Sequence, residues 1–229
     1  MEVKNALIVV AHPDDEVLGM GATAASLIEK GWTVRACILS ATAGARTQRP
    51  TDAELSADIK TAQEVLGLKS PILGDFPNIE FNTVPHLKLV QFIENAIRET
   101  GSQVLFTHHP GDLNIDHRCT SEACQAAARL SQRNSQIPKL QGLYYLETPS
   151  GTDWSFRVEG PVFRPTAYFE IGEAGLQKKM NALECYRNVL RPFPHPRSVE
   201  AIRGLAAVRG GESGLRYAEA FETAFQELT

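Results

Sequence analysis

The chain has 229 residues, enough to bury a sizeable core, and its 43% hydrophobic and 22% charged residues are ordinary for a soluble globular protein. A net charge of −4 gives no global basic field, which excludes general binding to nucleic acid or to an anionic membrane surface. No apolar stretch approaches the roughly 20 residues that a membrane span needs, which excludes a membrane-spanning protein.

Apolar runs typical of strands alternate with segments at helical spacing over the first two-thirds of the chain. Strands are predicted at 6–11, 33–39 and 104–107, and helices at 21–30, 51–66, about 89–97 and 122–132. Thr51 followed by Glu54 indicates a capping box at the start of one helix. Strands alternating with helices form βαβ units. The pattern therefore predicts a Rossmann-like layered α/β fold with a mostly parallel sheet and helices on both faces.

The pattern changes after Pro138. Strands are predicted at 142–147 and 168–171, helices at about 174–190 and 199–207, and a last segment at 218–228. There is no internal repeat and no Ser/Gly linker. We therefore expect a single domain over 1–229, with a core at 1–137 and a C-terminal elaboration at 138–229.

Two polar clusters follow predicted strands, at 12–16 and at 108–117. Ligands bind at the carboxyl ends of the strands in open parallel sheets, so both clusters are expected at one crevice. Like charges there raise one another's pKa, and a divalent cation relieves this effect. Two imidazoles and a carboxylate with one open position make a catalytic zinc site. Either cluster alone is also compatible with a turn and a helix cap, but the pair favours a functional site.

With these residues the chain resembles the PIG-L/LmbE-like family of zinc-dependent de-N-acetylases. The sequence Ala-His-Pro-Asp-Asp-Glu at 11–16 is the family's signature, and Asp-x-x-x-Asp-His at 112–117 is its second element. Further likeness at 163–171, 193–198 and 218–221 extends the resemblance over essentially the whole chain. It implies an enzyme that removes an N-acetyl group from an amino sugar or its conjugate.

Position by position, the resemblance implies that His12, Asp15 and His117 hold Zn²⁺ and that Asp14 is the general base. Zinc lowers the pKa of a water bound to it to around 7, which makes hydroxide available at neutral pH. Asp14 would hold that water, take its proton and pass the proton to the departing amine.

Asn114 departs from the family pattern, because many relatives have a histidine three residues before the last zinc ligand. An asparagine amide donates hydrogen bonds but does not transfer a proton. Either Asn114 keeps only the role of stabilising the oxyanion, or His195 supplies the missing imidazole. His109 is a weaker candidate for the same role and for contact with the substrate.

Other polar residues near the motifs have two interpretations each. Asp116 is expected to orient an imidazole or to cap the following helix, and Asp112 is expected to support the ligands from behind. Arg46 and Arg49 contact the substrate or are solvated charges of a loop. Arg197 either pairs with an acidic neighbour or contacts an anionic substrate.

Two other functions stay open at this point. One is a zinc amidase for a non-sugar N-acyl compound, and the other is a non-catalytic module that binds a nucleotide or a sugar. A phosphoesterase with two metals would need more oxygen ligands than the motifs supply. The expected partner is a small N-acetylated molecule, with self-association left open.

The four cysteines are scattered and form no CxxC pair, which argues against a cysteine zinc site and against a disulfide framework. We expect them to be buried or half-buried thiols. A cytoplasmic location is the simplest setting for them, and no cleavable leader pattern follows Met1.

Overall fold

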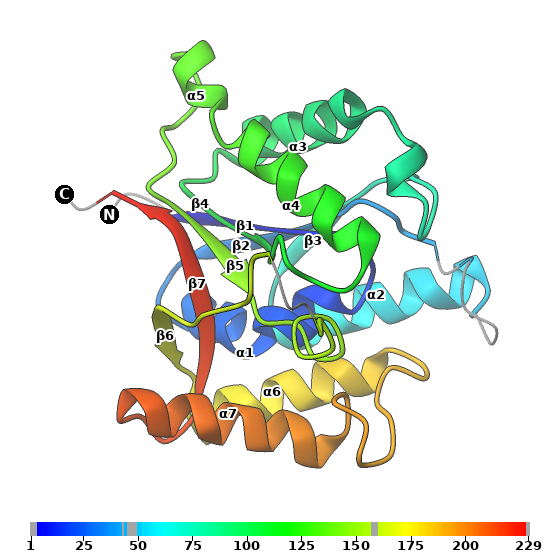
Figure 1. The fold of residues 1–229 in the computed structure, drawn as a ribbon, viewed down its shortest axis with the longest axis vertical. Coiled ribbons are helices and arrows are strands. Elements are labelled where there is room, and N and C mark those ends of the chain that lie inside the picture. The colour runs from blue at the N-terminus through cyan, green and yellow to red at the C-terminus, as the bar shows by residue number, and fades with distance from the viewer. Residues whose placement is uncertain (1–3, 43, 45–49, 157–159, 228–229) are drawn as a thin grey trace.

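The computed structural model describes residues 4–42, 44, 50–156 and 160–227, and it has a seven-stranded sheet with helices on both faces (Figure 1). The strand order is β3-β2-β1-β4-β5-β7-β6. The strands are β1 (Asn5–Val10), β2 (Thr33–Ile38), β3 (Lys69–Leu73), β4 (Val104–His108), β5 (Gly142–Leu146), β6 (Ala167–Glu170) and β7 (Ala218–Gln226). Strands β1 to β5 are mutually parallel, and β7 runs antiparallel to both β5 and β6. The predicted fold class is confirmed.

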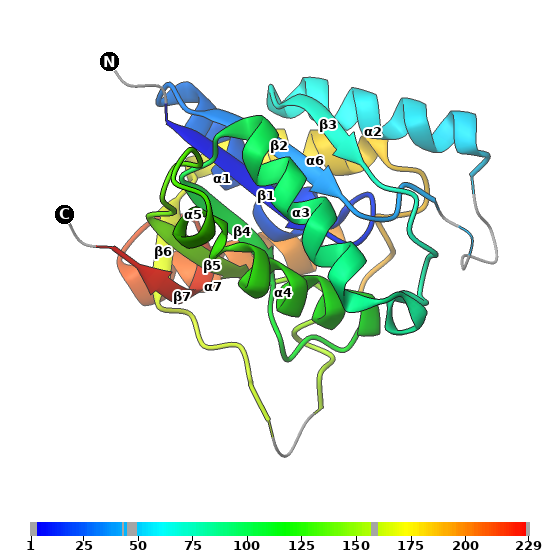
Figure 2. The ribbon, with the colours of Figure 1, turned by 90° about the horizontal axis from the view of Figure 1, so that it is seen from above.

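The helices form two layers (Figures 1 and 2). They are α1 (Asp15–Glu29), α2 (Asp52–Leu66), α3 (His86–Thr100), α4 (Ile115–Ala127), α5 (Leu130–Arg133), α6 (Gly172–Cys185) and α7 (Val199–Ser213), with a 3₁₀ turn at Phe81–Thr83. Figure 1 shows α3 and α4 on one face of the sheet and α1, α6 and α7 on the other. The predicted capping box at Thr51 and Glu54 begins α2.

Strand β1 explains why the molecule has a core on each face. Successive side chains of a strand point to opposite faces. Ile8 and Val10 pack in the core beneath α1, α2 and α6, whereas Leu7 and Val9 pack in the core beneath α3 and α4. All four side chains have no exposed surface. A continuous apolar run is therefore required here, because both faces of the strand are covered.

Helix α1 is kinked at Met20, whose φ of −154° and ψ of 26° are not helical. A kink leaves backbone groups without partners in the helix, and buried ones must be satisfied elsewhere. Lys179 of α6 donates to the carbonyl of Leu18 at 2.7 Å. Glu219 of β7 accepts from the amides of Ala22 and Thr23 at 3.3 and 2.6 Å.

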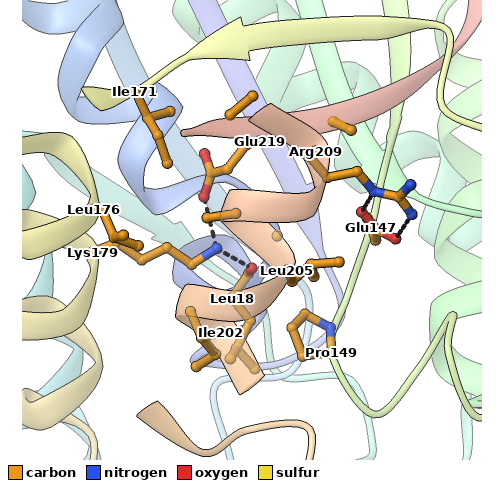
Figure 3. A pocket seen from close by; sticks show the side chains of 14 residues that line it. Leu18, Glu147, Pro149, Ile171, Leu176, Lys179, Ile202, Leu205, Arg209 and Glu219 are labelled. Carbon is orange, nitrogen blue, oxygen red and sulfur yellow. Dashed lines mark hydrogen bonds and ion pairs between the residues drawn. The ribbon is translucent and has the colours of Figure 1, made fainter. Parts of the chain in front are cut away.

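The two side chains that bond to the free backbone groups at the kink also form an ion pair with each other. Lys179 Nζ lies 2.7 Å from Glu219 Oε1, and both side chains are 7% exposed (Figure 3). A second ion pair, between Arg209 and Glu147, lines the same small cavity. The C-terminal third of the chain thus holds the shape of the helix that follows the first sequence motif.

Several of the predicted helix boundaries are wrong. Helix α1 begins at Asp15 rather than at about Gly21, because the first motif itself forms the first turn. The predicted helix at 122–132 is instead α4, which begins at Ile115, followed by the separate short α5. Helix α7 continues to Ser213, and the last segment is strand β7.

Two further expectations concern membrane-spanning helices and the cysteines. None of the helices in the described ranges is long and apolar enough to cross a membrane. All four cysteines are free and are buried or half-buried, as predicted.

Candidate metal centre

The sheet topology brings the two polar clusters together. Strands β1 and β4 are parallel neighbours, with Val9 opposite Thr107, so their carboxyl ends lie side by side. A cleft of about 230 Å³ opens there. It is lined by His12, Pro13, Asp14, Asp15, Thr42, Leu55, Asn78, Ile79, Asn114, His117 and Arg197.

The first cluster turns sharply between β1 and α1. Asp14 is the N-cap of α1 and has a φ of 96°, in the left-handed region that side chains with a Cβ rarely adopt. Its amide donates to Glu16 Oε2 at 3.2 Å, and its carbonyl accepts from Leu18 at 2.9 Å. Asp15 accepts from the amide of His12 at 3.0 Å. This turn brings the three side chains of His12, Asp14 and Asp15 to one cleft.

The second cluster is ordered by helix capping. Asn114 is the N-cap of α4, and its Oδ1 accepts from the amide of Asp116 at 2.9 Å. Asp112 Oδ1 accepts from the amide of Asn114 at 2.9 Å. Because the cap fixes where the helix begins, His117 falls on its first turn and lines the cleft.

His12, Asp15 and His117 offer ligand atoms that all lie within 4.8 Å of one another. Asp15 Oδ2 is 3.4 Å from His12 Nδ1 and 3.2 Å from His117 Nε2. Two ligands of a tetrahedral zinc ion, each bound at the usual length, stand about 3.3 Å apart. The spacing of these buried atoms therefore fits a metal ion. Because the three residues line a cleft, an ion held there has room for a further ligand from the cleft side.

Each imidazole has a carboxylate on its other nitrogen. Asp116 Oδ2 lies 2.9 Å from His12 Nε2, and Asp112 Oδ2 lies 3.0 Å from His117 Nδ1. Asp116 also accepts from the amide of Ile79 at 2.6 Å, which ties the segment after β3 to the cluster. Such carboxylates fix the ring orientation and raise the basicity of a ligating histidine. Asp116 therefore lies where it orients His12, and the interpretation of Asp116 as the helix cap is wrong, because Asn114 caps α4.

The charged groups of the cluster shift one another's pKa. Burial opposes a charge on His117, but attraction to Asp15 and Asp112 outweighs burial and raises the pKa of His117 to about 10. Burial opposes ionisation of Asp15 as well, but the attraction of His117 holds its pKa well below the usual value. Burial likewise disfavours the charged form of His12, yet hydrogen bonds with Asp116 and Asp15 raise its pKa. Without a metal, the cluster therefore holds protons where a metal would bind.

Zinc binding to the metal-free chain is expected to release at least about one proton at pH 7, because His117 must lose its proton to bind a metal. Affinity should then rise by up to about tenfold per pH unit for each proton released. Calorimetry in two buffers of different ionisation enthalpy measures the number of protons. An association constant that does not change between pH 6 and 8 would contradict this ligand role of His117.

His108 forms the wall behind the cluster. Its ring stacks on that of His117, with centroids 3.7 Å apart, and its Nε2 accepts from the amide of Ala11 at 3.0 Å. Burial and the neighbouring His117 lower the pKa of His108, so the ring is neutral and can accept that bond. His108, Asp112 and His117 form a second compact group of metal-ligand type. Neither His108 nor Asp112 lines the cleft, so we take the first group as the candidate centre.

Other residues predicted for the site lie elsewhere. The ring of His195 packs edge-on against Trp154 at 5.0 Å, its Nδ1 accepts from the amide of Arg197, and it does not line the cleft. His109 is buried against Tyr145, and its Nε2 lies 3.4 Å from Glu222 of β7. Neither residue is among those that line the cleft. Arg46 and Arg49 lie outside the described residues.

Sequence analysis missed the contribution of the segment between β3 and α3. Asn78 and Ile79 line the cleft, and the amide of Phe81 donates to Asp116 at 2.9 Å. No motif marks this segment, because it acts largely through its backbone. The sequence also did not predict that Glu16 is buried behind the cleft. There Glu16 accepts hydrogen bonds from Tyr186 at 2.6 Å and from Gln63 at 2.9 Å.

The chain is similar to known proteins over most of its length. A family model described as "GlcNAc-PI de-N-acetylase" (PIG-L) matches residues 7–128. The Escherichia coli K12 protein described as "uncharacterized deacetylase YaiS" is 30% identical over 183 residues, covering 76% of this chain and 90% of that protein.

Solved structures have the same fold at lower identity. N,N'-diacetylchitobiose deacetylase from Pyrococcus horikoshii superposes with a TM-score of 0.77 at 18% identity, covering 97% of this chain and 84% of the other. GalB, a 4-carboxy-2-hydroxymuconate hydratase from Pseudomonas putida, superposes with a TM-score of 0.80 at 20% identity, covering 99% and 98%. Because a deacetylase and a hydratase share this fold, the fold alone does not fix the reaction.

Proposed function

Because the chain belongs to the PIG-L family of de-N-acetylases, we propose that it is a zinc-dependent hydrolase that removes an N-acetyl group from an amino sugar or its conjugate. The observation that carries the proposal is one cleft that holds three mutually close ligand-type side chains beside a further buried carboxylate. His12, Asp15 and His117 are the three, and Asp14 is the fourth residue.

Zinc is the metal that suits this donor set best. Two imidazole nitrogens and one carboxylate oxygen are typical of catalytic zinc sites that keep one position open. When bound, zinc supplies a Lewis acid that activates a water and polarises an acyl oxygen. In this proposal His12, Asp15 and His117 hold the ion, and Asp116 and Asp112 keep the two imidazoles oriented.

Asp14 is the proposed general base. Asp14 is 1% exposed and lines the cleft next to Asp15, a proposed metal ligand. The left-handed backbone at Asp14 costs of order 1–3 kcal/mol, and such strain is common at sites where a side chain must be aimed. Asp14 takes the proton of the attacking water and delivers it to the amine nitrogen as the carbon–nitrogen bond breaks. Acetate and a free amine are the products.

The choice of an amino sugar rests on the relatives. The matching family model is named for an N-acetylglucosamine lipid, and the chitobiose deacetylase with the same fold is named for an N-acetylated disaccharide. The cleft's polar lining, with Thr42, Asn78 and Asn114, suits a substrate rich in hydroxyl groups. A non-sugar N-acyl substrate is the alternative, and a binding module without chemistry is disfavoured because binding alone would not need the four acidic and imidazole groups.

The test is amine release by the zinc-loaded chain. We expect free amine and acetate in equal amounts from N-acetylglucosamine or N,N'-diacetylchitobiose, with kcat/KM at least about tenfold above that for N-acetylbenzylamine. Tenfold corresponds to about 1.4 kcal/mol, roughly one good hydrogen bond to a sugar hydroxyl. Amine from N-acetylbenzylamine alone would favour the non-sugar amidase. No amine from any of the three by metal-loaded protein would contradict the proposed reaction.

A further inference from the structure

Arg197 occupies a distinctive position in the cleft. Among the lining residues that the structure describes, it is the single arginine or lysine, whereas Asp14 and Asp15 bring two carboxylates. Its Nη1 lies 3.6 Å from Asp14 Oδ2. Its side chain is 22% exposed, so the guanidinium is neither buried in the core nor free in solvent.

The guanidinium is held by a separate part of the chain. Arg197 Nε donates to Ser150 Oγ at 2.7 Å, and the Arg197 amide donates to His195 Nδ1 at 3.0 Å. The His195 ring in turn packs edge-on against Trp154. The loop that carries Arg197 is thereby attached twice to the segment that follows β5. These anchors use Nε and the backbone, whereas Nη1 lies beside Asp14 in the cleft.

The position of Asp14 limits what Arg197 can contact. A general base lies within about 2.6–3.2 Å of the water whose proton it takes. That water bonds to the acyl carbon, and the acyl oxygen sits on the same carbon. A guanidinium nitrogen 3.6 Å from the base therefore reaches groups on the reacting carbon or next to it.

We propose that Arg197 is a catalytic residue whose guanidinium donates hydrogen bonds to the acyl oxygen as negative charge develops on it, and that Ser150 and His195 position it. The inference rests on the proposed amide hydrolysis. In that reaction the water oxygen bonds to the acyl carbon, the carbon–nitrogen bond breaks, and the proton moves through Asp14 to the amine. Arg197 stays protonated throughout, because a guanidinium is a donor that does not give up its proton in proteins.

The charge of the cleft explains the need for such a donor. A developing oxyanion next to Asp14 and Asp15 is repelled, and a fixed cation at hydrogen-bond distance offsets that repulsion. Asn114 also lines the cleft, but its Oδ1 is used in capping α4 and its amide is neutral. His195 does not line the cleft, so its part here is to hold Arg197.

The experiment compares variants of the zinc-loaded chain on the substrate with the best amine release. Arg197→Met is expected to lower kcat by about 10²–10³-fold, the usual loss for one oxyanion donor, with KM changed by less than about threefold. Ser150→Ala should cost about tenfold or less, and nothing further in the Arg197→Met background. Arg191→Met is the matched control, because this exposed arginine of the same loop does not line the cleft.

Two further measurements distinguish a catalytic role of Arg197 from a role in folding and from a simple ion pair with Asp14. Added guanidinium ion should raise kcat of Arg197→Ala but not of Asp14→Asn. The loss in Arg197→Met should persist at every pH between 6 and 9, and the zinc content should equal that of the unaltered chain.

Three results would overturn the inference while leaving the proposed function intact. They are a kcat of Arg197→Met within about threefold of the unaltered chain, a loss confined to KM, and full recovery of activity at high pH. Failure of guanidinium to rescue Arg197→Ala combined with loss of zinc would assign Arg197 a purely structural role. An unaltered chain that releases no amine overturns both proposals together.

Discussion

Asp14→Asn is expected to lower turnover by at least about two orders of magnitude while the metal stays bound. Asparagine has nearly the same shape and tolerates the left-handed backbone of this position, so the turn and the cap are kept. It cannot accept the proton of the attacking water. The measurement is kcat for amine release, with zinc content determined on the same sample.

The control for this variant is Asp52→Asn, which makes the same chemical change at an exposed aspartate in the first turn of α2 that does not line the cleft. It should leave kcat within about twofold of the unaltered chain, as expected for a surface change. Near-normal turnover in Asp14→Asn would remove Asp14 from its role. Loss of zinc in Asp14→Asn would indicate that this carboxylate supports the metal rather than the proton transfer.

Lys179→Met is expected to have the largest effect on stability, about 3–5 kcal/mol in the free energy of unfolding. The substitution leaves Glu219 buried without its cation and the carbonyl of Leu18 without its donor. Urea denaturation followed by circular dichroism measures the change.

The neighbouring residue provides the matched control. Lys178 pairs with Glu29 at 2.6 Å at the surface, with 41% and 63% of the two side chains exposed, so Lys178→Met should cost at most about 1 kcal/mol. The double variant Lys179→Met/Glu219→Gln should recover part of the loss, because no unpaired charge remains. Equal costs for the two single lysine variants would show that the buried pair does not stabilise the kink.

The strands that position the site could be predicted because both of their faces are covered. Continuous apolar runs at 6–11 and 104–107 correspond to β1 and β4, whose carboxyl ends hold the two clusters. Strand β3 was not predicted: it is short, lies at the edge, is half exposed and contains Pro71. A residue without a backbone N–H is tolerated at an edge, but it weakens the pattern that marks a strand.

The ligand-type residues and the carboxylates Asp112 and Asp116 behind them could be located from sequence, whereas the backbone contacts that hold Asp116 could not. His12, Asp15 and His117 fall within motifs and at strand ends, and the structure brings them together. The contacts of Ile79 and Phe81 with Asp116 join segments more than 30 positions apart, and no local pattern encodes them. Of the two interpretations of Arg197, the sequence could not indicate that its acidic neighbour is Asp14, whose Oδ2 lies 3.6 Å from the guanidinium.

The helix that carries the first motif shows a limit of a different kind. The helix was predicted to begin at Gly21, whereas Gly19 and Gly21 both lie inside α1. A Cβ on Gly19 would lie 2.9 Å from Leu146 of β5, so the glycine serves close packing of the helix on the sheet. Helix propensity is low at such a position, and tertiary packing decides.

The measurement that tests the central claim most directly is the metal content of the purified chain by elemental analysis, repeated after dialysis against a chelator and then zinc. The account predicts about one zinc per chain, as a single catalytic site would hold. The zinc should be lost in His12→Ala, whereas Asp14→Asn should keep the same zinc content as the unaltered chain. Persistent absence of metal after exposure to zinc would contradict the account, because His12, Asp15 and His117 would then not form a metal centre.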